Sequence, residues 1–108
     1  MNKYIAVLGT GGTGSNIGVD LIRVGYDVLL VDQWPAHVEA MKAHGLCVSM
    51  PGPGNDHDNP VEFQVPVQAL HLCDLCTLKR QFDIVFLACK SYDSRWKVEL
   101  MRPYLKLT

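Results

Sequence analysis

A glycine-rich turn between an apolar segment and a helical pattern constrains the fold of this chain most strongly. The apolar segment, Tyr4-Ile5-Ala6-Val7-Leu8, is typical of a strand buried on both faces of a parallel sheet. The next six residues, Gly9-Thr10-Gly11-Gly12-Thr13-Gly14, match the pattern G-x-G-x-x-G. Apolar residues then recur at helical spacing from Ile17 until Gly25. This order predicts an α/β fold of the Rossmann type, in which helices flank a parallel sheet.

Each glycine of the turn has a mechanical reason in a dinucleotide site. Gly9 permits the tight turn, Gly11 lets the backbone approach a pyrophosphate, and Gly14 allows the helix to pack closely on the strand. The free N–H groups and the positive dipole end of the following helix also favour a phosphate. A turn that merely joins strand to helix is the alternative, whereas a GKT/S-type phosphate loop is excluded because no Lys-Ser/Thr pair follows. We therefore expect residues 9–14 to bind a dinucleotide.

A second strand supplies an acidic residue where the adenosine ribose of a dinucleotide would arrive. The segment Asp27-Val28-Leu29-Leu30-Val31 is apolar and β-branched, and it completes a βαβ unit within about 30 residues. Asp32 ends this strand, where a carboxylate accepts hydrogen bonds from the ribose hydroxyls. No Arg or Lys follows until Lys42, so a 2′-phosphate would find no counter-charge. We expect Asp32 and Gln33 to contribute to the cofactor site, with NAD(H) preferred and NADP(H) as the second candidate. Trp34 is either an apolar wall for the adenine or a packed aromatic residue.

Turn-forming residues divide the rest of the chain into further segments. The patterns predict, in order, a helix from Pro35 to Gly45, a strand over residues 46–50, a surface loop over residues 51–60, a strand with one solvated face over residues 61–65, a short helix over residues 69–81 and a central strand over residues 84–89. Ser91 can cap a last helix, which Pro103 interrupts. We expect Tyr92, Trp96 and Leu100 to form the apolar stripe of that helix.

The composition fits one globular domain that covers residues 1–108. Of the 108 residues, 48% are hydrophobic and 19% are charged, which is unlike a disordered or fibrous chain. A formal net charge of −1 provides no basic surface for nucleic acid or for anionic lipid. No apolar run approaches the roughly 20 residues that a membrane span needs, and the first residues do not resemble a signal sequence. We therefore expect a cytoplasmic protein whose partners are small molecules.

Two groups of candidate metal ligands give weak signals. Cys73 and Cys76 have C-x-x-C spacing, but a structural zinc site needs two further ligands, and no second pair follows. We expect them to be ordinary cysteines of a helix or loop, with metal or redox use as the lesser alternative. His57 lies between Asp56 and Asp58 among turn-forming residues, where a solvated cluster is the more frequent outcome. The sequence therefore predicts no metal site.

A lysine follows the apolar strand expected over residues 84–89. Because ligands of open α/β sheets bind outside the carboxyl ends of the strands, we expect Lys90 to face the cofactor cleft, with a surface lysine as the alternative. Three segments together resemble the amino-terminal part of the ketopantoate reductases (2-dehydropantoate 2-reductases). They are residues 9–15, His37-Val38-Glu39-Ala40 leading to Gly45-Leu46, and Ala88-Cys89-Lys90-Ser91-Tyr92-Asp93. The resemblance implies that the glycine turn binds the pyrophosphate and that Lys90 contacts the cofactor.

The resemblance also implies a function for a longer protein. Members of this family reduce a 2-keto acid, 2-dehydropantoate, to the 2-hydroxy acid by hydride transfer from NAD(P)H, a step of pantothenate biosynthesis. The family residues that handle the keto acid are an asparagine after the next strand and a lysine and a glutamate of a helical carboxyl-terminal domain. These positions lie beyond Thr108. We therefore expect no catalytic residue here, and a truncated gene product or an excised domain with an incomplete sheet. Other 2-keto acids and a homodimer of the full-length form stay open.

A non-catalytic regulatory module that senses NAD is the alternative function. Such modules use the same glycine pattern and the same acidic residue at the end of the second strand. The lysine segment around Lys90 argues against this alternative.

Overall fold

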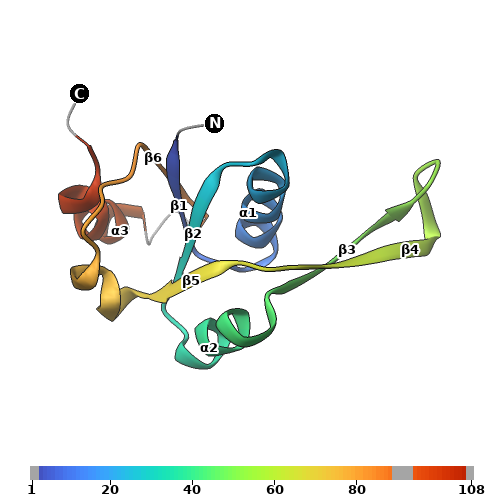
Figure 1. Cartoon of the computed structure of the whole chain (residues 1–108), viewed down its shortest axis with the longest axis horizontal. Coiled ribbons are helices and arrows are strands. Elements are labelled where there is room, and N and C mark those ends of the chain that lie inside the picture. The colour runs from blue at the N-terminus through green and yellow to red at the C-terminus, as the bar shows by residue number, and fades with distance from the viewer. Residues whose placement is uncertain (1–2, 89–93, 107–108) are drawn as a thin grey trace.

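The structure is a computed structural model that describes residues 3–88 and 94–106. It contains a four-stranded sheet, a separate two-stranded sheet and the helices that surround them (Figure 1). In chain order the elements are β1 (Tyr4–Leu8), α1 (Gly12–Val24), β2 (Asp27–Asp32), α2 (Pro35–His44), β3 (Leu46–Gly52), β4 (Asp56–Val65), β5 (Gln68–His71), the 3₁₀ helix η1 (Leu72–Thr77), β6 (Ile84–Leu87), α3 (Ser94–Met101) and the 3₁₀ helix η3 (Arg102–Tyr104). Within these described ranges, no helix combines the length and the apolarity that crossing a bilayer requires.

The four-stranded sheet is parallel and has the strand order β5-β2-β1-β6. Ile5 of β1 is level with Val28 of β2 on one side and with Ile84 of β6 on the other. All five residues of β1 are buried, which explains why its sequence is continuously apolar. Because β2 and β6 lie on opposite sides of β1, the chain reverses its direction of winding there, as in a Rossmann sheet. The predicted Rossmann-type α/β fold is confirmed.

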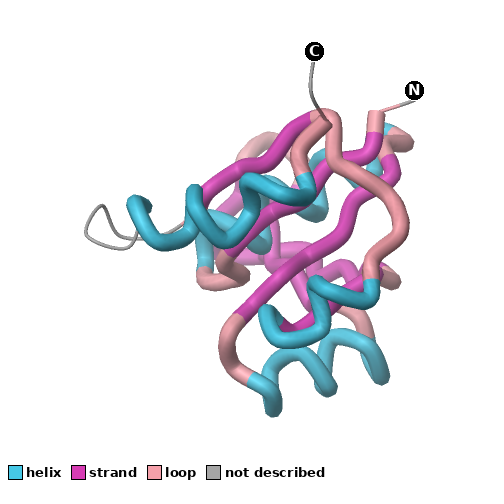
Figure 2. Tube along the Cα trace, turned by 90° about the vertical axis from the view of Figure 1, so that its left-hand side faces the viewer, coloured by secondary structure: helices cyan, strands magenta, loops and turns pink. Residues whose placement is uncertain are grey.

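Helices cover both faces of this sheet. On one face, α1 and α2 pack against β1 and β2 through Val19, Val38 and Met41, each 1% exposed. On the other face, η1 and α3 contribute Leu75 and Met101, which are also 1% exposed. Figure 2 shows the strands running between helices. Since burying one such side chain stabilises a fold by about 1.5–3 kcal/mol, both layers hold the sheet in place.

β3 and β4 form an antiparallel hairpin that projects from the body of the molecule (Figure 1). Its tip turns at Gly54 and Asn55, whose φ angles of 75° and 61° lie in the left-handed region that these residue types adopt readily. The prediction of a surface loop over residues 51–60 is therefore wrong, because most of these residues belong to strands. Residues 57–60 are exposed, so this part of β4 keeps the polar composition of a loop. The strands expected over residues 46–50 and 61–65 are present as parts of the hairpin.

The third strand of the parallel sheet is β5, in a segment where the sequence predicted a helix. β5 pairs with β2, and Ala69 is level with Leu30. The sequence predicted a short helix over residues 69–81. The first residues of this range belong to the strand β5, so the prediction is wrong there, and the helix that does form in the range, the 3₁₀ helix η1, is shorter than predicted. Four strand residues are too few for a periodic pattern to distinguish strand from helix. Pairing with the buried strand β2 decides the conformation here.

β6 ends at Leu87, earlier than the predicted strand, and Cys89 lies outside the described residues. Within the described sheet β6 pairs with β1 alone and forms an edge, so its expected central position is wrong for this part of the chain. Ile84 and Phe86 are accordingly 40% and 37% exposed.

α3 presents a different face to the core from the one expected. Lys97 and Met101 are its buried residues, whereas Trp96 is 41% exposed. The prediction that Trp96 belongs to the apolar stripe of this helix is therefore wrong. The predicted cap Ser91 and the stripe residue Tyr92 lie outside the described residues.

Asp83 fixes the start of β6. Its Oδ2 accepts a hydrogen bond of 2.8 Å from the amide N–H of Tyr4, and the Nζ of Lys106 lies 3.2 Å from its Oδ1. The Tyr4 amide and the Lys106 ammonium hold the pKa of the Asp83 carboxyl below its ordinary value. This anchoring keeps β6 in register beside β1, so that its carboxyl end reaches the glycine turn.

The amino terminus of α1 approaches β1 closely because Gly14 has no side chain. A Cβ on Gly14 would overlap the carbonyl oxygen of Gly9 and would lie 3.0 Å from the Cβ of Ala88. Gly11, which caps α1, differs in this respect, because a Cβ there would meet no atom within 4 Å. The fold therefore requires glycine at position 14 and leaves space at position 11.

This contrast predicts that alanine destabilises the fold more at position 14 than at position 11. Gly14→Ala should lower the free energy of unfolding by about 1–3 kcal/mol, because the backbone of Gly9 cannot move away from the added methyl group. Gly11→Ala, the matched control, should change it by less than about 1 kcal/mol, because its backbone conformation suits alanine. Urea unfolding of both variants measures the difference. Equal midpoints for the two variants would contradict this account of helix packing.

Candidate functional site

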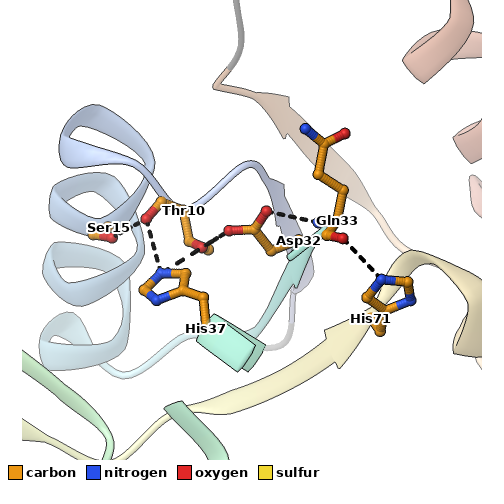
Figure 3. Close-up of polar contacts among 6 residues, drawn as sticks. All are labelled: Thr10, Ser15, Asp32, Gln33, His37 and His71. Carbon is orange, nitrogen blue, oxygen red and sulfur yellow. Dashed lines mark hydrogen bonds and ion pairs between the residues drawn. The ribbon is translucent and has the colours of Figure 1, made fainter. Parts of the chain in front are cut away.

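The carboxyl ends of β1, β2 and β5 meet at one edge of the parallel sheet, beside the amino termini of α1 and α2 (Figure 1). The glycine turn follows β1, and Asp32 is the last residue of β2. Figure 3 shows six residues of this edge, joined by hydrogen bonds and one ion pair. The structure thus brings together the glycine turn, Asp32 and Gln33, which the sequence singled out separately.

The glycine turn leaves the first amides of α1 open. Gly9 has a φ of 99°, and its N–H donates a hydrogen bond of 2.8 Å to the carbonyl oxygen of Val31. The first hydrogen bond within the helix runs from the N–H of Ser15 to the carbonyl oxygen of Gly11. No side chain caps this described helix, and its first turn contains no acidic residue. The N–H groups before Ser15 therefore have no helical acceptor and can bind an anion.

Gly11 and Thr13 are exposed on this turn, while Thr10 and Gly14 are buried. Gly12 is the first residue of α1. The turn therefore presents Gly11 and Thr13 to solvent and packs Thr10 and Gly14 into the fold.

Asp32 is tied to the glycine turn. Its Oδ2 accepts a hydrogen bond from the hydroxyl of Thr10, and its Oδ1 accepts one of 2.6 Å from the amide N–H of Gln33 (Figure 3). Thr10 and Asp32 are 5% and 7% exposed, so this contact is shielded from water. A carboxylate offers about four acceptor positions, so these two bonds leave room for a ligand hydroxyl. The carboxylate is thereby held in one orientation at the end of β2.

His37 belongs to the same group, although the sequence gave it no role in a site. Its Nε2 lies 3.2 Å from the carbonyl oxygen of Thr10 and 4.0 Å from Oδ2 of Asp32. The hydroxyl of Ser15 donates to the same Thr10 carbonyl at 2.9 Å. A histidine in the first turn of the helix that follows the acidic strand end is the signal that could have identified it.

His71, at the end of β5, holds the backbone after Asp32. Its Nδ1 accepts a hydrogen bond of 3.1 Å from the N–H of Cys73, so its Nε2 carries the hydrogen and donates to the carbonyl oxygen of Gln33 at 2.9 Å. Both ring nitrogens of His71 are therefore used. Sequence reasoning missed this residue because the segment was expected to be helical.

The other residues that the sequence singled out either lie apart from this group or are not among the described residues. Lys90 is not among the described residues, but Ala88, two positions before it, donates its N–H to the carbonyl oxygen of Leu8 at 2.9 Å. Trp34 is 64% exposed, so a role as a packed aromatic residue is wrong. Cys73 and Cys76 are exposed free thiols. Among residues 3–88 and 94–106, no three His, Cys, Asp or Glu side chains form a group that could hold a metal ion.

The following two are among the solved structures that share this fold. A structure assigned as a 2-dehydropantoate 2-reductase from Enterococcus faecalis has a TM-score of 0.78 and 27% sequence identity, over 95% of this chain and 30% of that chain. A D-mandelate dehydrogenase, solved with NADH and anilino(oxo)acetate, has a TM-score of 0.77 and 26% identity, over 95% of this chain and 30% of that chain.

Proteins of similar sequence include 2-dehydropantoate 2-reductases as well. A 2-dehydropantoate 2-reductase from Lactococcus lactis subsp. lactis (strain IL1403) is 36% identical over 74 residues, which cover 68% of this chain and 24% of that protein. One from Streptococcus pyogenes serotype M1 is 32% identical over 80 residues, which cover 72% of this chain and 24% of that protein. The family described as Ketopantoate reductase PanE/ApbA matches residues 5–108. Because this match includes the glycine turn, the acidic strand end and the segment after β6, the chain belongs to the ketopantoate reductase family.

Proposed function

We propose that this chain binds a nicotinamide dinucleotide at the carboxyl edge of its parallel sheet, as the cofactor-binding part of a 2-keto acid reductase. The observation that carries the proposal is the open row of amides at the start of α1, directly beside the anchored carboxylate of Asp32. The family membership and the relatives named 2-dehydropantoate 2-reductase support an oxidoreductase. The D-mandelate dehydrogenase solved with NADH supports a nicotinamide cofactor. When bound, such a cofactor supplies the hydride that reduces a keto group.

The residues at this edge fit a pyrophosphate. The amides before Ser15 have no helical acceptor, and the space beside Gly11 would be filled by a Cβ. An anion there is also stabilised by the positive end of the α1 dipole, an interaction typically worth about 0.3–1 kcal/mol. We assign residues 9–14 to the pyrophosphate on these grounds.

Asp32 and Gln33 are assigned to the adenosine ribose. The carboxylate of Asp32 is oriented by Thr10 and by the Gln33 amide, and it keeps acceptor capacity for a ribose hydroxyl. A 2′-phosphate at the same place would be repelled by this buried negative charge. NAD(H) is therefore the preferred cofactor in this proposal.

The rest of the reaction is assigned to residues outside this chain. The chain spans about a quarter of the length of the curated relatives that it matches, since the matches cover 24% of those proteins. We assign the binding of the 2-keto acid and the proton transfer to the remaining three quarters. Lys90 is proposed to face the cofactor, because the described chain up to Ala88 lies against the glycine turn.

The direct experiment separates cofactor binding from turnover. Calorimetry should detect binding of NADH by the 108-residue chain. Oxidation of NADH or NADPH in the presence of 2-dehydropantoate should stay at background, because no residue assigned to the keto acid is in this chain. Absence of dinucleotide binding by the folded chain would overturn the proposed function. Turnover above background would overturn the assignment of catalysis to residues elsewhere.

Gly11→Val should abolish dinucleotide binding and leave the fold intact. The structure has space for the side chain, since a Cβ at Gly11 meets no atom within 4 Å, but that space is the one assigned to the pyrophosphate. Ala43→Val, which adds bulk at an exposed position near the end of α2, is the control and should bind normally. Calorimetry with NADH and circular dichroism of both variants give the two readouts. If folded Gly11→Val binds NADH with unchanged affinity, the glycine turn is not the pyrophosphate site.

Cofactor selectivity tests the assignment of Asp32. At about pH 8, NAD(H) should bind at least about tenfold tighter than NADP(H), a difference of about 1.4 kcal/mol. The double variant Asp32→Asn and Gln33→Arg should narrow or reverse this difference, because it removes the repulsion and adds a counter-charge for the 2′-phosphate. Titration of both cofactors against both proteins measures it. Equal or tighter binding of NADP(H) by the unmodified chain would refute the role given to Asp32.

A further inference from the structure

A histidine at the start of α2 lies beside the carboxylate assigned to the adenosine ribose. The Nε2 of His37 is 4.0 Å from Oδ2 of Asp32, and the side chains of His37 and Asp32 are 41% and 9% exposed. The imidazole of His37 is therefore the more exposed of the two neighbouring groups. Because the side chain of His37 is more exposed than that of Asp32, the histidine has the larger surface for contact with a ligand.

The two ring nitrogens of His37 have different surroundings. Nε2 faces the carbonyl oxygen of Thr10 at 3.2 Å, and a carbonyl can only accept, so this nitrogen carries a hydrogen. In Figure 3 both dashed lines that reach His37 end on this one nitrogen. Among the described residues, no hydrogen-bond partner is present for Nδ1 of His37. Nδ1 is thus an acceptor when the ring is neutral and a donor when the ring is protonated.

We propose that His37 reads the 2′ position of the adenosine ribose and is a specificity-determining residue for the cofactor. This inference rests on the proposed function, because it requires a dinucleotide at this edge of the sheet. The neutral ring adds no charge beside Asp32, so the negative carboxylate favours the uncharged 2′-hydroxyl of NAD(H). The protonated ring places a positive charge 4.0 Å from Oδ2 of Asp32 and offsets part of the repulsion that the 2′-phosphate of NADP(H) meets there. The preference for NAD(H) therefore weakens when acidification protonates the ring.

Asp32 is the charged neighbour of His37 in the surrounding elements. From β2, Asp32 is the charged group within ion-pair distance of His37 among the described residues. The glycine turn and α1 contribute Thr10 and Ser15, which are uncharged. Further along α2, Lys42 lies 3.7 Å from Glu39 and pairs with it. Protonation of His37 thus changes the charge next to Asp32 more than any of these other contacts does.

His71 provides a matched control at the same edge. It is also a histidine that contacts the segment after Asp32, but its Nδ1 accepts from the Cys73 amide and its Nε2 donates to the Gln33 carbonyl. Neither nitrogen is left for a ligand. His71→Gln removes an imidazole from this edge without removing the one that is proposed to read the ribose.

The experiment measures the ratio of the dissociation constants of NADPH and NADH at about pH 8 and about pH 6. It uses the 108-residue chain, His37→Gln, His37→Lys and His71→Gln. Glutamine keeps an N–H that can donate to the Thr10 carbonyl and does not titrate, and lysine supplies a fixed positive charge. The 2′-phosphate itself gains a proton near pH 6, with a pKa of about 6, and His37→Gln measures that contribution alone.

In the unmodified chain and in His71→Gln, the ratio should fall on acidification by about fivefold more than in His37→Gln, which is the upper range for an exposed ion pair. His37→Lys should have a low ratio at both pH values. Equal pH dependence in His37→Gln and the unmodified chain, with both cofactors bound, would overturn the role of His37 and leave the proposed function standing. Loss of the pH dependence in His71→Gln alone would also overturn it. No binding of either cofactor at either pH would refute the proposed function, and this inference with it.

Discussion

The close approach of α1 to the end of β1 is the constraint on which the rest of this structure depends. It exists because Gly14 carries no side chain where the Gly9 carbonyl and Ala88 lie. With the helix in this position, its first amides point past the end of the sheet, where no acceptor of the same helix can reach them. One packing requirement therefore both closes the βαβ unit and leaves the first amides of the helix free to bind an anion, as proposed.

A second interaction connects this turn to the neighbouring strand. The hydroxyl of Thr10 donates to Asp32 in a buried contact between residues 22 positions apart. A hydrogen bond to a charged group contributes about 1.5–3 kcal/mol, so the turn and the end of β2 are held as one unit. His37 and Ser15 both contact the carbonyl of Thr10 and so extend the unit to the starts of α2 and α1. The assigned pyrophosphate and ribose positions therefore belong to one connected piece of structure.

The elements with strong local patterns could be predicted from the sequence, and those that depend on distant partners could not. β1 and α1 were predicted because a buried strand is continuously apolar and because Gly25, with a φ of 113°, ends the helix. β5 was not, since its four residues become a strand by pairing with β2. In the hairpin, residues 57–60 are exposed, and they are three polar residues followed by a proline, so the strand has the composition of a loop.

The same division applies to the site. The glycine turn and Asp32 were predicted from their spacing along the chain, because the βαβ unit fixes where they meet. The contacts of His37 and His71 were not predicted, because they reach residues 27 and 38 positions away. No local pattern carries that information. The placement of Lys90 remains a prediction, since the described chain stops at Ala88 and resumes at Ser94.

Mapping the bound dinucleotide on the backbone amides tests the central claim most directly. A nitrogen-15 labelled sample of the chain, titrated with NADH and followed by heteronuclear NMR, reports each amide separately. The account predicts that the largest shift changes occur at Gly11, Thr13 and Gln33, at the carboxyl edge of the sheet. It would be contradicted if the largest changes lay instead around Tyr26 and Val67, which line a hollow at the opposite edge of the sheet.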